Sequence, residues 1–318
     1  MTVAGWWIAW ICACFGFAAV LGSLCGEAAW RRWSSVLLAA LALVVPFSIQ
    51  GGPVLRAAVA LELLWVCVKV IGLARERTTR PAWFRVLQLL VLHDLRQDAA
   101  ATRAASSGAV SRARSDWRPG SLLGACVWGA FAAVALWLAL FVAATLPAPW
   151  QRLLRCAAGL AFAYTGVEGA LGVFEFVYRV CGLRPPIFHQ QPILALSIGE
   201  FWGRRWNRIV GRWLFATFYR PLALRGQAAL GLSAAFVGSA LLHLYFTWAA
   251  IGLAAGWRMA VFFLAQLPLL FLERWLQQSR WPEPARRLWT LGWLALSSPL
   301  FVEPMLDILA GGFAPGVR

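Results

Sequence analysis

The sequence predicts an all-α polytopic membrane protein with about eight transmembrane helices and additional interfacial or re-entrant helices. The first observation is composition: 61% of the 318 residues are hydrophobic, only 13% are charged, and the mean hydropathy is +0.69. A soluble domain usually has about 45–50% apolar residues, so this excess is far more than a soluble core requires. The other two observations are that the apolar residues fall into long runs, and that basic residues concentrate in alternate connections between these runs.

Eight apolar runs approach the length of about 20 residues that a helix needs to cross the hydrocarbon layer. The second run is short and the third contains Glu62 and Lys69, so these two could form a tilted or partly buried hairpin. The first run is long for a signal-peptide core and has no basic segment before it, so we expect a retained helix. In chain order the runs are 3–26, 34–50, 54–74, 121–146, 156–182, 228–254, 257–273 and 288–309.

Basic residues predict which side of the membrane each connection faces, because an excess of Lys and Arg marks cytoplasmic loops. Two, nine, seven and four of them, 22 of the chain's 29, lie in the connections 27–33, 75–120, 183–227 and 273–287. Only Arg152 and Arg155 lie in the intervening connections, 51–53, 147–155 and 255–256. We therefore expect an outward N-terminus and a cytoplasmic loop 183–227. The membrane would be the inner membrane of a bacterium or, in a eukaryote, the endoplasmic reticulum.

The formal net charge of +16 is spread over these membrane-flanking loops. Topology and anionic lipid headgroups account for it, so we expect membrane lipids and no nucleic acid as partners. The seven cysteines lie mostly within apolar runs and include no CxxC pair. We therefore expect neither a metal site nor a disulfide framework.

The connection between the third run (54–74) and the fourth (121–146) contains one polar and one amphipathic segment. The stretch "RQDAAATRAASSGAVSRARSDWRPG" predicts a flexible cytoplasmic loop over 94–119. Before it, "WFRVLQLLVLHDL" (83–95) is too short to span and suits an interfacial or re-entrant helix. His93 and Asp94 are adjacent there, but neighbours on a helix point about 100° apart, so we interpret them as a surface pair.

The run 156–182 carries three charged residues. Glu175 and Arg179 are four residues apart and suit a structural ion pair near a membrane face. Glu168 lies deeper, projects in roughly the same direction as Glu175, and is a second-tier candidate for lining a site.

The stretch "SIGEFWGRRWNRIVGRW" (197–213) surrounds Asn207 with aromatic and basic residues. An asparagine can donate and accept hydrogen bonds without titrating, so it could hold a carbonyl oxygen or a histidine. The residues alone favour an ordinary surface turn residue. The spacing of the arginines indicates one side of a helix, facing either phosphates of a cosubstrate or lipid headgroups. Tryptophans here suit the membrane interface. The arginines are Arg204, Arg205, Arg208 and Arg212, and the tryptophans are Trp202, Trp206 and Trp213.

His243 lies near the middle of the run 228–254. Ionisable groups at that depth usually face a bundle interior or a cavity, which favours a functional role, although a hydrogen bond between helices is the alternative. Gly231, Ala235, Ser239 and His243 recur every four residues and so share one helix stripe. The small residues could allow tight packing or line a tunnel, and Ser239 could orient the imidazole or bond to its own helix. The role of a general base suits this histidine better than the role of a charged residue.

The block "FWGRRWN", the following "YRP" (219–221), and Ser239 and His243 within an apolar helix resemble the wax-synthase branch of the membrane-bound O-acyltransferases. The resemblance is specific over roughly 184–250. It implies a helical fold with a central tunnel, His243 as the catalytic residue and Asn207 as its partner. Two positions differ from the family pattern: Ala240 replaces a glycine and Leu244 replaces an acidic residue, so substrate preference does not transfer.

The resemblance implies a single membrane-embedded acyltransferase domain over 1–318. Its parts would be N-terminal helices (1–182), the motif region (183–254) and C-terminal helices (255–318). An alcohol would attack an acyl-CoA thioester after His243 removes its proton, with no tightly bound cofactor and no metal. Residues expected to contact substrate or CoA are Trp202, Arg204, Arg205, Trp206, Arg208 and Ser239.

The leading hypothesis is therefore esterification of a long-chain lipophilic alcohol to a wax-type ester. The same chemistry could act on a sterol or a secondary metabolite, with a donor as short as acetyl-CoA. A different class is a proton-coupled lipid or solute transporter using His243 and Glu168. It predicts inverted repeats that the sequence does not display and gives no reason for the "FWGRRWN" block. Oligomeric state, acyl chain length and acceptor are left open.

Overall fold

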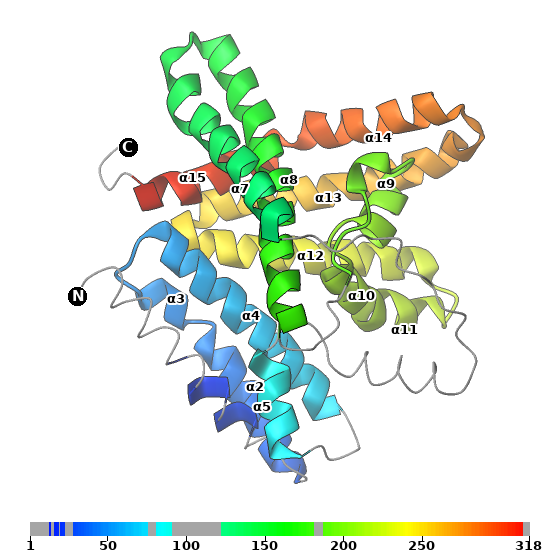
Figure 1. Cartoon of the computed structure of the whole chain (residues 1–318). Coiled ribbons are helices and arrows are strands. Elements are labelled where there is room, and N and C mark those ends of the chain that lie inside the picture. Colours follow the sequence, from blue (N-terminus) through cyan, green and yellow to red (C-terminus); the bar gives the residue numbers. More distant parts are fainter. Residues whose placement is uncertain are drawn as a thin grey trace. The chain divides into compact units, whose positions relative to one another are not determined.

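The computed structural model describes residues 28–75, 81–90, 122–180 and 187–313, together with scattered positions between 13 and 22 (Figure 1). All regular structure in these ranges is helical, and they contain no strand. The chain divides along the sequence into two compact units, residues 1–117 and 118–318, and each is described by itself. The predicted loop 94–119 and the His93–Asp94 pair lie outside the described residues, as does most of the predicted first span.

The first unit contains α2 (Ala29–Ala42), α3 (Val45–Ser48), α4 (Pro53–Arg75) and α5 (Ala82–Leu90). The three shorter helices α2, α3 and α5 all pack on α4. Residues 29–48 and 53–75 are long and apolar enough to cross a membrane, close to the predicted hairpin. Lys69 is buried within α4, where its Nζ lies 3.4 Å from the Leu89 carbonyl oxygen and 5.5 Å from the Trp65 ring centroid. These contacts stabilise the buried ammonium group of Lys69 between two apolar helices.

The second unit begins with a helical hairpin. Its first arm is α7 (Leu122–Trp137), η1 (Leu138–Val142) and η2 (Ala143–Thr145), and its second is α8 (Ala148–Val180). The arms approach closely at two glycines of α8. A Cβ at Gly169 would lie 3.1 Å from the Gly129 nitrogen, and one at Gly172 would lie 2.9 Å from the Ala125 Cβ.

Six short elements of the described residues connect α8 to the next long helix. They include the asparagine block, which is the stretch 197–213 around Asn207. They are η3 (Pro192–Leu194), α9 (Ile198–Glu200), η4 (Phe201–Arg205), α10 (Arg208–Leu214), η5 (Phe215–Tyr219) and α11 (Arg220–Ala223).

Two long helices follow, α12 (Ala228–Ile251) and α13 (Leu253–Trp275), and they lie side by side (Figure 1). The sequence analysis placed their connection at 255–256, but the helices are separated by Gly252 alone. This residue has φ 105°, a backbone conformation that favours glycine. Hydropathy did not locate the turn because apolar residues continue on both sides of it.

The C-terminal span was predicted as one helix over 288–309, which is wrong. The structure has η6 (Gln278–Arg280), α14 (Glu283–Ser297) and α15 (Pro299–Phe313), and the last two are bent by 49° at their junction. The described residues thus hold six candidate spans, or seven if this bent pair counts as one, in place of about eight.

Ion pairs hold α15 against its neighbours. Arg155 of α8 contacts Glu303 at 2.7 Å and Asp307 at 2.9 Å, and Arg258 of α13 lies 3.7 Å from Asp307. The predicted interhelical pair between Glu175 and Arg179 stays a prediction, because the Arg179 side chain lies outside the described residues.

Candidate active site

The asparagine block folds as two short helical segments separated by a turn. The Ser197 hydroxyl caps α9 by accepting the Glu200 N–H at 2.9 Å, and α9 continues into the π-helical turn η4. The helix then stops at Trp206, and α10 starts afresh after Asn207. The expectation that most of the four arginines cluster on one side of one helix is therefore wrong, because the first two lie in η4 and the last two in α10.

Asn207 occupies this turn in the left-handed conformation, with φ 36° and ψ 61°. Asparagine tolerates that region better than most residues. Its side-chain oxygen accepts the Val210 N–H at 3.4 Å and so caps α10. The turn role considered in the sequence analysis is thus real, while the two N–H donors of the amide are not used by this cap.

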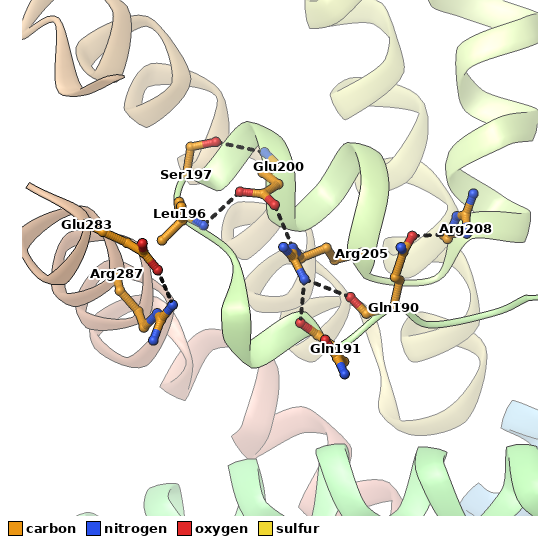
Figure 2. A network of polar contacts seen from close by, with 9 residues as sticks. All are labelled: Gln190, Gln191, Leu196, Ser197, Glu200, Arg205, Arg208, Glu283 and Arg287. Carbon is orange, nitrogen blue, oxygen red and sulfur yellow. Dashed lines mark hydrogen bonds and ion pairs between the residues drawn. The ribbon is translucent and has the colours of Figure 1, made fainter. Parts of the chain in front are cut away.

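Arg205 holds the block together through Glu200 (Figure 2). Its Nε donates to Glu200 Oε1 at 2.7 Å, and its Nη1 donates to the carbonyl oxygens of Gln190 and Gln191, each at 3.1 Å. Glu200 Oε2 also accepts the Leu196 N–H at 2.9 Å. Two of the three guanidinium nitrogens of Arg205 are therefore committed within the chain.

The same contacts set the protonation of Glu200. Burial alone would raise the pKa of its carboxyl, but the hydrogen bond from Leu196 and the bond and charge of Arg205 outweigh it, with a further contribution from Arg286. The net effect is a pKa below the ordinary value of 4.5. Glu200 is therefore a carboxylate at neutral pH and a stable partner for Arg205.

The other three arginines near Asn207 differ in their contacts. Arg204 is exposed, whereas Arg208 donates from Nη1 to the Gln190 side-chain oxygen at 3.2 Å (Figure 2). Arg212 donates from Nε to the Arg208 carbonyl oxygen at 3.2 Å. Arg204 is thus the arginine most available to an external anion, and the CoA contacts predicted for this set stay predictions.

Trp206 stacks with two rings. The His189 ring centroid lies 4.4 Å from that of Trp206 with planes 27° from parallel, and the Phe201 centroid lies at 5.6 Å with planes 13° from parallel. His189 Nδ1 in turn lies 3.3 Å from Glu168 Oε1, so the second-tier residue Glu168 reaches the asparagine block from α8. His189 was not among the site residues predicted from the sequence. Its signal was its position, directly before the block in "IFHQQP", as one of only three histidines.

Trp202 connects the block to the long helices. Its ring packs on Phe263 of α13 at 5.4 Å and on Phe262 at 6.0 Å. Its indole nitrogen is buried and has no hydrogen-bond partner among the residues that the structure describes. Trp202 therefore places one buried donor beside the aromatic cluster of α12 and α13.

His243 contacts the same cluster. Its ring stacks on Phe263 at a centroid distance of 3.8 Å and meets Phe246 edge-on at 5.5 Å. Its Nδ1 lies 2.8 Å from the carbonyl oxygen of Ser239. A carbonyl oxygen only accepts, so Nδ1 carries the proton and Nε2 is left with a free lone pair. The backbone of Ser239, rather than its hydroxyl, orients the ring.

The small-residue stripe of α12 serves packing at Gly231. A Cβ at Gly231 would lie 2.7 Å from the Tyr219 carbonyl oxygen. At nearby Gly238 a Cβ would lie 2.8 Å from the Phe218 ring. Close approach of η5 to α12 therefore accounts for the glycine at 231.

His243 and Trp202 both contact Phe263, so the structure brings these two predicted residues to one cluster. Among the described residues, no hydrogen bond joins Asn207 to His243, and their predicted partnership stays a prediction. In the same ranges no group of three or more His, Cys, Asp or Glu side chains is placed to hold a metal ion. This arrangement can support acid–base chemistry at His243.

Comparison with known proteins identifies the segment around this cluster. Residues 184–265 match the membrane bound O-acyl transferase family, and the match covers about a quarter of the chain. The chain is distantly homologous to plant wax synthases. It is 32% identical over 128 residues to the probable long-chain-alcohol O-fatty-acyltransferase 2 of Arabidopsis thaliana, covering 34% of this chain and 37% of that protein.

Two further relatives give the same result. A probable long-chain-alcohol O-fatty-acyltransferase 9 of Arabidopsis thaliana is 28% identical over 165 residues, which are 45% of this chain and 46% of that protein. The long-chain-alcohol O-fatty-acyltransferase of Simmondsia chinensis is 32% identical over 110 residues, which are 32% of this chain and 31% of that protein. The similarity thus spans less than half the length of each of these relatives.

Proposed function

We propose that this chain, whose residues 184–265 match the membrane bound O-acyl transferase family, transfers an acyl group from acyl-CoA to a lipophilic long-chain alcohol. The product is a wax-type ester. The observation that carries the proposal is the hydrogen bond from His243 Nδ1 to the Ser239 carbonyl oxygen, at 2.8 Å, because it leaves Nε2 as a base inside an apolar helix bundle. The names of the relatives support the substrate class.

In this mechanism His243 Nε2 removes the hydroxyl proton of the alcohol while the alcohol oxygen attacks the thioester carbonyl carbon. The C–S bond then breaks, and the imidazolium returns the proton to the departing CoA sulfur. The ester and free CoA leave, and His243 is again neutral. No acyl-enzyme and no external proton is needed.

Asn207 would supply hydrogen bonds to the thioester carbonyl oxygen. Its side-chain oxygen caps α10, and its amide N–H groups are still available to donate. Donors aimed at the developing negative charge of the tetrahedral intermediate lower the barrier. Such a contact requires substrate to bridge Asn207 and His243, since no hydrogen bond links them directly in the described residues.

Arg204 would contact the phosphates of CoA. It is exposed, whereas Arg205 and Arg208 already donate to groups of the chain. A cytoplasmic position for 183–227 would give the charged CoA head access while its acyl chain stays in the bilayer.

A substrate panel tests the proposal. Membranes containing the protein are supplied with a labelled acyl-CoA together with one acceptor at a time. The acyl-CoAs have several lengths, and the acceptors are fatty alcohols, sterols and diacylglycerol. We expect ester formation with long-chain alcohols. Ester formation only with sterols would keep the chemistry and change the acceptor, and release of no ester from any pair would overturn the proposal.

A further inference from the structure

A side-chain contact between Glu168 and His189 joins α8 to the segment before the asparagine block. The two side chains are 16% and 6% exposed, and His189 Nδ1 lies 3.3 Å from Glu168 Oε1. Placing a carboxylate this deep in a long apolar helix is costly unless it has a partner. The pair is therefore unlike the exposed pair of Glu283 and Arg287, which lies on one face of α14 and is 62% and 39% exposed.

His189 uses its ring as well as its Nδ1. The ring stacks on Trp206, and Phe201 also stacks on that indole. Phe201 meets Trp202 edge-on at 4.9 Å, and Trp202 packs on Phe263. Because Phe263 stacks on His243, an unbroken series of ring contacts runs from the Glu168–His189 pair to the candidate base.

The backbone beside His189 is also joined to the block. The Arg208 N–H donates to the Phe188 carbonyl oxygen at 2.8 Å, and the Gln190 N–H donates to the Arg205 carbonyl oxygen at 2.9 Å. These two bonds lie on either side of Asn207 in the sequence. Backbone hydrogen bonds therefore join residues 188–190 to residues 205–208, and Phe188 adds an edge-on contact with Phe174 of α8 at 5.3 Å.

We propose that Glu168 and His189 are a positioning pair that fixes Trp206 and Asn207 on α8, at the distance from His243 that acyl transfer requires. The inference rests on the proposed function for its catalytic consequence. Its structural half, that Glu168 anchors 187–208, does not depend on any activity. Neither residue touches substrate in this scheme, and they act through the stacked indole and the turn beside it.

Four variants separate the contributions of the pair. Glu168→Ala removes the acceptor, Glu168→Gln keeps an oxygen at the same place, and His189→Phe keeps a ring on Trp206 while losing the hydrogen bond. The double variant Glu168→Ala with His189→Phe tests whether the two act as one unit. Glu283→Ala is the matched control, because it removes a shorter but exposed ion pair of 2.7 Å elsewhere in the same unit.

The first measurement is hydrogen–deuterium exchange of the purified proteins. In Glu168→Ala we expect faster exchange across 187–208 and unchanged exchange across α12 and α13. Glu168→Gln and the Glu283→Ala control should exchange like the wild type. Unchanged exchange in Glu168→Ala would overturn the anchoring role, whether or not the protein makes esters.

The second measurement is the rate of ester formation. For Glu168→Ala and His189→Phe we expect kcat to fall by roughly 10- to 100-fold, as for a misplacement of about 1 Å, with little change in KM for acyl-CoA. The double variant should lose no more than the worse single variant, and Glu168→Gln should recover most of kcat. Faster exchange with an unchanged kcat would overturn the positioning role, whereas a wild type without ester formation would overturn the proposed function and leave the exchange result to decide the anchor.

Discussion

His243 Nδ1 lies 2.8 Å from the carbonyl oxygen of Ser239, one helical turn earlier in α12. The acceptor is part of the helix backbone, so it cannot titrate or rotate away. The imidazole is therefore held in one tautomer with Nε2 unprotonated, and Phe263 stacks on its face. A histidine restrained in this way is prepared to take a proton from a bound alcohol.

Asn207 is expected to have two separable roles, a structural one at its oxygen and a catalytic one at its nitrogen. Asn207→Asp keeps an oxygen to cap α10 and a side chain that tolerates the left-handed turn, but it removes the amide donors. We expect thermal unfolding close to that of the wild type and a kcat lower by about 10²-fold, the usual loss for one donor to an oxyanion. An Asn207→Asp enzyme with the kcat of the wild type would assign Asn207 to the turn alone.

Arg204 and Arg205 are adjacent but should respond differently to substitution. Arg205→Lys loses the planar fork that joins Glu200 to Gln190 and Gln191, and its partners are partly exposed, so we expect a loss of about 1–2 kcal/mol in unfolding free energy. Arg204→Ala should leave unfolding unchanged and raise KM for acyl-CoA, less so at high salt. Thermal unfolding and KM at two ionic strengths distinguish them, and a raised KM in Arg205→Lys alone would reverse the assignment.

Glu200 predicts an acid sensitivity of the asparagine block. Its pKa is lower in the folded protein than its ordinary value of 4.5, so its contribution to stability is fully present above 4.5 and is lost as the pH falls below that value through the lowered pKa. Hydrogen–deuterium exchange of 196–208 between neutral and acidic pH would measure it. Glu200→Gln should remove this pH dependence, and a block that loosens equally in both proteins would show that another group is responsible.

Gly231 distinguishes packing from a tunnel along the small-residue stripe. Gly231→Ala would bring a Cβ to 2.7 Å from the Tyr219 carbonyl oxygen, which is backbone and cannot swing away. We expect a loss of about 1–3 kcal/mol in stability. Gly292→Ala in α14 is the control, because a Cβ there meets nothing within 4 Å and should be neutral or slightly stabilising. A Gly231→Ala protein with unchanged unfolding temperature would argue for open space beside α12.

The sequence allowed the long helices of the fold to be predicted, because hydropathy over about 20 residues is a local property. It could not locate the Gly252 turn or the bend before α15, since both depend on backbone conformation within apolar sequence. The prediction that most of the arginines cluster on one side of one helix was wrong, because Asn207 adopts the left-handed conformation and separates two helical segments. His243 was visible as an isolated ionisable residue in an apolar run, whereas the Glu168–His189 contact joins residues 21 positions apart through tertiary packing.

The most direct test of the account is ester formation by purified wild-type protein and by His243→Ala, measured with the same long-chain acyl-CoA and alcohol. The account predicts that His243→Ala unfolds at a similar temperature and loses about 10²–10⁴-fold in kcat, the contribution expected of a general base. A folded His243→Ala protein that forms ester at the wild-type rate would contradict it.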